Sequence, residues 1–166
     1  PAPAAAAPAA AAEAPAKPAP ASEVDATLGD IYARETASHV AALREWVGKQ
    51  RALPAPHALS EPAYRACHTL AGSSKTAGAR HGIRLAEPLN HWLRKSFDSG
   101  VGLVDADLDL VEACMAAMEA VSTHLNEDSG FFASHPRLRE RIAQAEAALD
   151  QRIAAATAPE PAPVAV

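Results

Sequence analysis

The chain has 166 residues and a formal net charge of −5, with 49% hydrophobic residues but only 4% aromatic residues. The acidic balance gives no electrostatic support to nucleic-acid binding, and no apolar run approaches the roughly 18 residues that a membrane span needs. The cysteines Cys67 and Cys114 lack the spacing of disulfide frameworks and metal sites, so we expect reduced core residues of a cytoplasmic protein without a signal peptide.

Alanine and proline dominate both ends of the sequence, over residues 1–22 and 155–166. Proline interrupts helices, and neither segment has the large apolar side chains that form a core. We interpret both ends as semi-extended linkers that flank one helical domain, over residues 23–154, within a longer multidomain chain.

Between these linkers, apolar residues recur at three- and four-residue spacing, which is typical of amphipathic helices. The expected helices span residues 23–51, 60–78, 81–98, 105–126 and 136–154. Short connections favour antiparallel packing of neighbours, and the last segment is strongly charged with a thin apolar stripe. The sequence therefore predicts an all-α fold, an antiparallel four-helix bundle with an additional C-terminal helix.

The second predicted helix carries the residues that indicate a function. At about 100° per residue, His68 lies opposite Leu70 and therefore faces solvent, while Lys75 falls about 20° from it, two turns further along. Arg65 flanks His68 one turn earlier. Gly72, one turn later, leaves space beside the imidazole although glycine costs about 1 kcal/mol relative to alanine inside a helix. An exposed imidazole is a nucleophile at neutral pH, and both cations could offset phosphoryl charge.

The sequence contains no glycine-rich nucleotide loop and no acidic metal cluster on this face. We therefore expect that a partner protein completes the chemistry, and that the domain binds no cofactor and has no autonomous activity. Tyr64, Ala71, Gly72 and Ala79 are expected to form a docking face around His68. For Tyr64, the sequence leaves open the alternative that its ring packs on the first helix.

Most other polar and sulfur-containing residues are assigned to packing or to the surface. Ser73 and Ser74 are expected to pack against a neighbouring helix, and Met115 and Met118 to lie in the core. The remaining histidines share no metal-ligand spacing and are assigned to the surface or to packing: His39, His57, His81, His91, His124 and His135.

Two runs resemble a known family. The first is His68-Thr69-Leu70-Ala71-Gly72-Ser73-Ser74, followed by Gly78, and the second is Leu85-Ala86-Glu87-Pro88-Leu89-Asn90. The first resembles the H-x-L-K-G-S-[SA]-x-x-x-G signature of histidine-containing phosphotransfer (HPt) domains. The second is similar to the L-A-x-P-L-E segment of HPt domains in CheA-like chemosensory hybrid histidine kinases, especially those of type IV pilus systems. The likeness covers about residues 60–95.

The resemblance implies a phosphorelay function. His68 would accept a phosphoryl group on a ring nitrogen and exchange it with the aspartate of a response-regulator receiver domain, which would supply Mg²⁺. A histidine kinase catalytic domain is a further partner that the resemblance implies. Ala71 and Asn90 stand where the family has a lysine and a glutamate that help the kinase domain phosphorylate the histidine. We therefore hypothesise a relay or reservoir that is charged by a receiver, with Lys75 in the cationic role.

Two alternatives belong to other classes of protein. One is an HPt-like adaptor that binds partners without carrying phosphate, although such a protein would not need to keep the acceptor histidine. The other is a metal-binding four-helix bundle, which requires carboxylates and Glu-x-x-His pairs that point into the core. No predicted core face carries such pairs.

Overall fold

The computed structural model describes residues 21–124, 137–161 and 163–164. These residues form helices and no strands, so the predicted all-α fold is confirmed. The helices are α1 (Ala21–Arg51), α2 (Glu61–Thr76), α3 (Arg80–Ser99), α4 (Asp105–Thr123) and α6 (Leu138–Thr157). Each expected helix has a counterpart. The expected ends at residues 126 and 136 lie outside the described residues.

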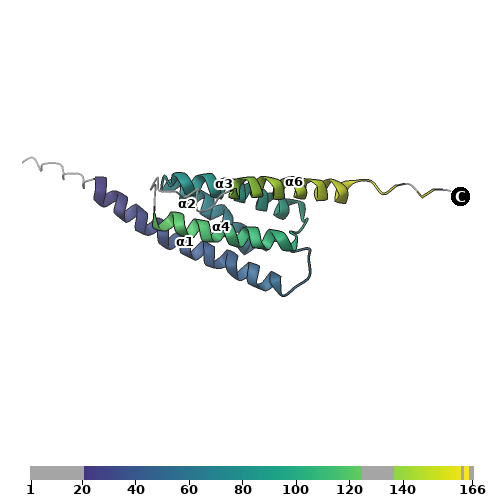
Figure 1. Cartoon of the computed structure of the whole chain (residues 1–166), viewed down its shortest axis with the longest axis horizontal. Helices are drawn as coiled ribbons and strands as arrows, with labels where there is room; N and C mark the ends of the chain where they lie inside the picture. The colour runs from purple at the N-terminus through teal and green to yellow at the C-terminus, as the bar shows by residue number, and fades with distance from the viewer. Residues whose placement is uncertain (1–20, 125–136, 162, 165–166) are drawn as a thin grey trace, which may run out of the picture.

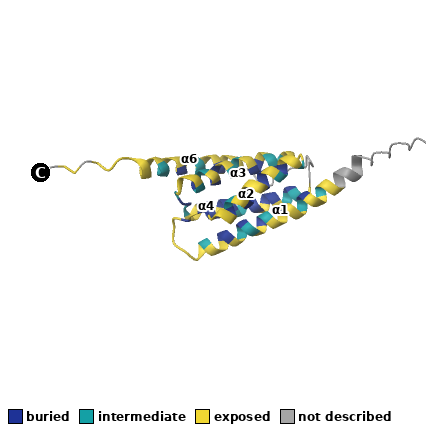
Figure 2. Cartoon of the chain, turned by 180° about the vertical axis from the view of Figure 1, so that it is seen from behind, coloured by how far each residue is buried: buried dark blue, intermediate teal, exposed yellow. Residues whose placement is uncertain are grey.

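Helices α1 to α4 form a bundle in which α1 contacts both α2 and α4, and α3 contacts the same two helices (Figure 1). Helix α6 lies along α3 and also contacts α4. Seen from behind, the buried faces of the helices turn toward one another and the exposed faces turn outward (Figure 2). This arrangement buries α2 on two sides and leaves one face of it in solvent.

Large apolar side chains fill the space between the helices. Those exposed by less than 2% include Leu43, Leu70, Leu85, Leu89, Trp92, Leu93, Leu108, Met115, Met118 and Ile142. Burial of each such side chain contributes on the order of 1.5–3 kcal/mol. Met115 and Met118 are therefore core residues, as the sequence predicts.

Both cysteines are buried and free of disulfide bonds, in agreement with their predicted role as core residues. Burial raises the pKa of the Cys67 thiol, and it raises the pKa of the Cys114 thiol to about 12. Neither residue is a thiolate at neutral pH, so neither is a reactive nucleophile.

Local interactions determine where α2 begins and ends. Ser60 caps the N-terminus, where its hydroxyl oxygen accepts a hydrogen bond of 3.3 Å from the backbone N–H of Ala63. Glu61 lies in the first turn, where a negative charge interacts favourably with the helix dipole. At the other end Gly78 has a φ of 64°, in the left-handed region that glycine adopts without strain. The reversal is short, so α3 returns directly alongside α2.

Helix α6 is attached to the outside of the bundle by apolar and charged contacts. Leu138, Ile142 and Leu149 are buried against it. Lys95 of α3 pairs with Glu146 at 2.6 Å and with Asp150 at 3.1 Å. The helix extends to Thr157, so residues 155–157, which the sequence assigns to the linker, are helical. No helix in the described ranges has both the length and the apolar character that crossing a membrane requires.

Candidate functional site

His68 lies on the solvent-facing side of α2, as the helical wheel predicts. Its neighbours Cys67 and Leu70 are fully buried and fix this part of α2 in the core. Within the part of the chain that the structure describes, no hydrogen bond or ion pair holds the His68 imidazole. Neither ring nitrogen of this exposed residue is therefore engaged by the described part of the fold.

The one ring contact of His68 among the described residues is with Tyr64, one turn earlier on α2. The two ring centroids lie 6.0 Å apart with an interplanar angle of 25°. The ring of Tyr64 also stacks on Phe97 of α3, at 4.5 Å and nearly parallel, with an angle of 2°. Tyr64 is thus half-buried, and the ring on which it stacks belongs to α3 and not to α1.

The open space expected beside the imidazole is present at Gly72. A Cβ atom added to this exposed glycine would meet no heavy atom within 4 Å. Packing within the described structure therefore does not require glycine at this position. A helix-interior glycine without a steric reason inside the chain is consistent with the close approach of a second molecule.

Both cations expected near His68 are exposed, and both have an acidic partner. Lys75 Nζ lies 2.7 Å from Glu87 Oε1 of α3, and Arg65 Nη2 lies 2.6 Å from Glu61 Oε1 on the same helix. Exposed ion pairs contribute only about 0–1 kcal/mol, so either cation can be redirected to a phosphoryl group at small cost. Nothing in the sequence alone marks Glu87 as the partner of Lys75.

Two residues assigned to the docking face are not on it. Ala71 is 6% exposed and Ala79 is fully buried. Ala71 lies on the flank of α2 that neighbouring helices cover, although it is only about 60° from His68 on the wheel. Ala79 lies beyond the end of α2 at Thr76, so the wheel of that helix does not apply to it. It instead packs with Tyr32 and Val121.

Behind the exposed face, the Tyr32 hydroxyl joins three helices. It lies 2.9 Å from the hydroxyl of Ser74, which also donates a hydrogen bond of 2.8 Å to the backbone carbonyl of Leu70. Burial raises the pKa of Tyr32, which keeps its hydroxyl protonated. A Cβ atom at Gly82 of α3 would collide with this hydroxyl. Ser74 is buried as predicted, while Ser73 is half-buried.

Asn90, at the position where the resembling family has a glutamate, lies on α3. Its Oδ1 atom is buried and has no hydrogen-bond partner among the described residues. The residue is neutral, so it places no carboxylate next to the α2–α3 surface. Within the same described ranges, no group of three or more histidine, cysteine, aspartate or glutamate residues is arranged to hold a metal ion.

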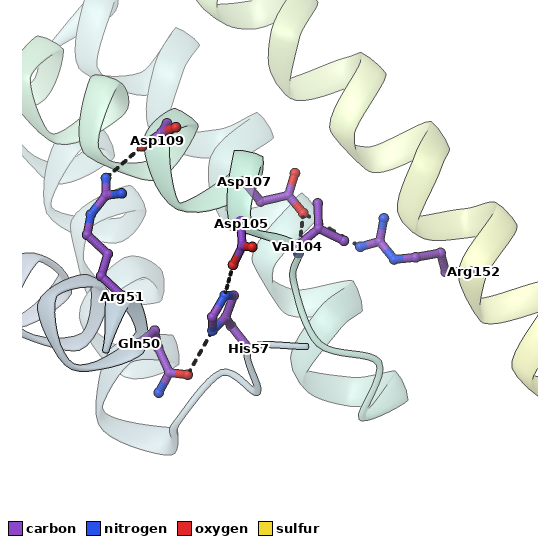
Figure 3. Close-up of polar contacts among 8 residues, drawn as sticks. All are labelled: Gln50, Arg51, His57, Val104, Asp105, Asp107, Asp109 and Arg152. Atoms are coloured by element: carbon purple, nitrogen blue, oxygen red, sulfur yellow. Dashed lines mark hydrogen bonds and ion pairs between the residues drawn. The ribbon is translucent and has the colours of Figure 1, made fainter. Parts of the chain in front are cut away.

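A second polar cluster, around His57, joins the α1–α2 connection to the start of α4 (Figure 3). The fully buried imidazole contacts Gln50 Oε1 through Nδ1 at 3.2 Å and Asp105 Oδ1 through Nε2 at 2.6 Å. Two backbone hydrogen bonds, of 2.8 and 2.9 Å, join His57 to Leu103. Every polar group of His57 is therefore used within the fold, which agrees with its predicted packing role.

Further contacts join the start of α4 to α6 and to α1. Asp107 Oδ2 accepts a hydrogen bond of 3.0 Å from the backbone N–H of Val104 and lies 3.6 Å from Arg152 of α6 (Figure 3). Arg51 Nη2 donates a hydrogen bond of 2.8 Å to Asp109. These contacts join the start of α4 to α1 and to α6.

Comparison with protein-family models, with curated proteins and with solved structures finds no match to this chain.

Proposed function

We propose that the chain is an HPt-like phosphorelay module, in which His68 accepts a phosphoryl group and exchanges it with the aspartate of a response-regulator receiver domain. The observation that carries the proposal is the exposed imidazole of His68, free of hydrogen bonds and ion pairs among the described residues, beside the open space at Gly72. An imidazole in this state keeps its lone pair for a reactant, and a second protein can approach it closely.

The transfer step is a displacement at phosphorus. The lone pair of an unprotonated ring nitrogen of His68 attacks the phosphorus of the receiver's aspartyl phosphate. A nitrogen–phosphorus bond forms, the oxygen–phosphorus bond to the aspartate breaks, and the aspartate leaves as a carboxylate. The other ring nitrogen keeps its proton. We place Mg²⁺ in the receiver, where it would offset charge on the phosphoryl oxygens.

Lys75 and Arg65 supply positive charge on the His68 side of the complex. Side chains on a helix lean toward its N-terminus, so Lys75 leans back toward His68. Lys75 also lies on the same face as His68, two turns away. Its partner Glu87 is exposed, so the pair can open when a phosphoryl group arrives.

We further propose that a receiver, and not a kinase domain, charges His68. Ala71 is buried and Asn90 is neutral, so neither residue replaces the lysine and glutamate that assist the kinase in the resembling family. The setting that fits is a cytoplasmic chemosensory histidine kinase system of the type that controls type IV pili and twitching motility. The alternative of an adaptor that carries no phosphate predicts receiver binding without phosphorylation.

The test is phosphorylation of the purified chain by a small phosphodonor such as phosphoramidate. We expect an acid-labile, base-stable label in the wild type and none in His68→Gln. His91→Gln is the control, because His91 is also an exposed helical histidine, but its Nδ1 lies 2.7 Å from Glu146 Oε1. Equal labelling of His68→Gln and wild type would contradict the assignment, and rapid labelling by a kinase domain with ATP alone would contradict the relay direction.

A further inference from the structure

Two contacts between α2 and α3 define the register of these helices beside His68. The ring of Tyr64 stacks on Phe97, and the ammonium of Lys75 pairs with Glu87. The order of the partners reverses from one helix to the other, so the two helices run antiparallel. His68 lies between the two contacts on α2, and the part of α3 opposite it therefore lies between Glu87 and Phe97.

Arg94 occupies the position on α3 that corresponds to His68. It lies seven residues after Glu87, and His68 lies seven residues before Lys75. Seven residues of a helix rise about 10 Å and return to within about 20° of the same face. Because the helices are antiparallel, both steps lead in the same direction along the bundle. Arg94 therefore faces His68 across the α2–α3 surface, as Glu87 faces Lys75.

The guanidinium of Arg94 has only a weak partner in the described structure. Its Nε lies 3.4 Å from Oδ2 of Asp98, one turn later on α3, and both side chains are more than half exposed. This contact directs the guanidinium toward the end of α3 where Phe97 meets Tyr64. The His68 imidazole stacks on the same Tyr64 ring. An exposed ion pair of this kind opens at small cost, so the guanidinium can turn to another anion.

We infer that Arg94 binds the phosphoryl group carried by His68, with two N–H groups of its guanidinium donating to two of the phosphoryl oxygens. The planar fork of arginine matches this arrangement, and its charge persists throughout the physiological pH range. Arg94 makes and breaks no covalent bond in the transfer. It supplies positive charge from α3, while Lys75 supplies it from α2. This inference rests on the proposed phosphorelay function.

The first experiment measures the equilibrium distribution of ³²P between a receiver and the chain. We expect Arg94→Gln to shift this equilibrium away from phosphorylated His68 by about two- to fivefold. Asp98→Asn removes the resting partner of Arg94 and should shift the equilibrium in the opposite direction. Arg51→Gln is the matched control, because Arg51 forms an exposed pair with an aspartate between α1 and α4. An equilibrium that is the same in Arg94→Gln and Arg51→Gln would overturn the inference.

A double-mutant cycle tests the placement of Arg94 without phosphorylation. His68→Glu introduces a carboxylate at the acceptor position, and chemical denaturation measures its effect with Arg94 present and in the Arg94→Gln background. We expect the two effects on the unfolding equilibrium constant to differ by up to about fivefold, and the same cycle with Arg51→Gln to show no coupling. Additive effects of His68→Glu and Arg94→Gln would overturn the inference, because Arg94 would not reach the acceptor position. Coupling in a chain whose wild type takes no label would instead refute the proposed function, while the placement of Arg94 would stand.

Discussion

Lys75 of α2 and Glu87 of α3 form an ion pair of 2.7 Å between the two helices that border the candidate site. The pair competes with any phosphoryl group for the same ammonium. Both side chains are about half exposed, at 60% and 48%, so the competition takes place in screened surroundings.

Replacement of Glu87 should make Lys75 available to the phosphoryl group. We expect Glu87→Gln to shift the equilibrium of transfer toward phosphorylated His68 by up to about fivefold, because an exposed ion pair is worth about 0–1 kcal/mol. Lys75→Gln should shift it in the opposite direction. The measurement is the equilibrium distribution of ³²P between receiver and chain. Glu45→Gln is the control, since Glu45 pairs with Lys49 on α1 in a comparable exposed contact. An equal response of Glu87→Gln and Glu45→Gln would argue against a role for Lys75.

Gly72→Ala should separate stability from function. The added methyl group meets nothing within 4 Å, and the substitution removes a flexible glycine from a helix. Thermal unfolding should therefore show that the free energy of unfolding rises by about 0.5–1 kcal/mol. Transfer from a receiver should become slower, whereas phosphorylation by a small phosphodonor should not. Gly48→Ala in α1 has equally open surroundings and should change stability alone. Unchanged transfer from the receiver in Gly72→Ala would show that Gly72 does not serve the approach of a partner.

The contact between Gly82 and the Tyr32 hydroxyl predicts strong coupling. Gly82→Ala should destabilise the fold by about 1–3 kcal/mol, because the new methyl group collides with the hydroxyl in a packed core. Tyr32→Phe removes the hydroxyl, so the cost of Gly82→Ala should fall by about half or more in that background. Chemical denaturation of the four proteins in this double-mutant cycle measures the coupling. Additive effects would mean that the collision is relieved elsewhere.

The attachment of α6 should weaken at high pH. The carboxylates of Glu146 and Asp150 raise the pKa of Lys95 above its ordinary value of 10.5. Its stabilising contribution is therefore fully present below pH 10.5 and is lost as the pH rises through the higher folded-state pKa. Unfolding measurements from pH 9 to 12 should show a smaller loss of stability for Lys95→Met than for wild type. An equal loss of stability with pH in wild type and Lys95→Met would indicate that the ion pairs do not hold α6.

The features that follow from local geometry could be predicted from the sequence. The exposure of His68 and the open space at Gly72 depend only on the period of one helix and the burial of Leu70. The cap at Ser60 and the left-handed turn at Gly78 likewise follow from the conformational preferences of serine and glycine. These features fix where α2 begins and ends and which of its faces is free.

Contacts between helices could not be predicted in the same way. The stacking of Tyr64 on Phe97 and the pair of Lys75 with Glu87 depend on the register of α2 against α3, which a helical wheel does not contain. The helical wheel misplaces Ala79 because this residue lies beyond the end of α2 at Thr76. The contact of the buried His57 with the exposed Asp105 joins residues 48 positions apart, and no local pattern marks it.

The central claim is most directly tested by incubating the chain with a receiver domain that has been phosphorylated on its aspartate. The fraction of ³²P that moves to the chain is then measured. The account predicts rapid transfer to wild type and His91→Gln, and none to a folded His68→Gln. Labelling of His68→Gln at the wild-type rate, or tight receiver binding without any label in wild type, would contradict it.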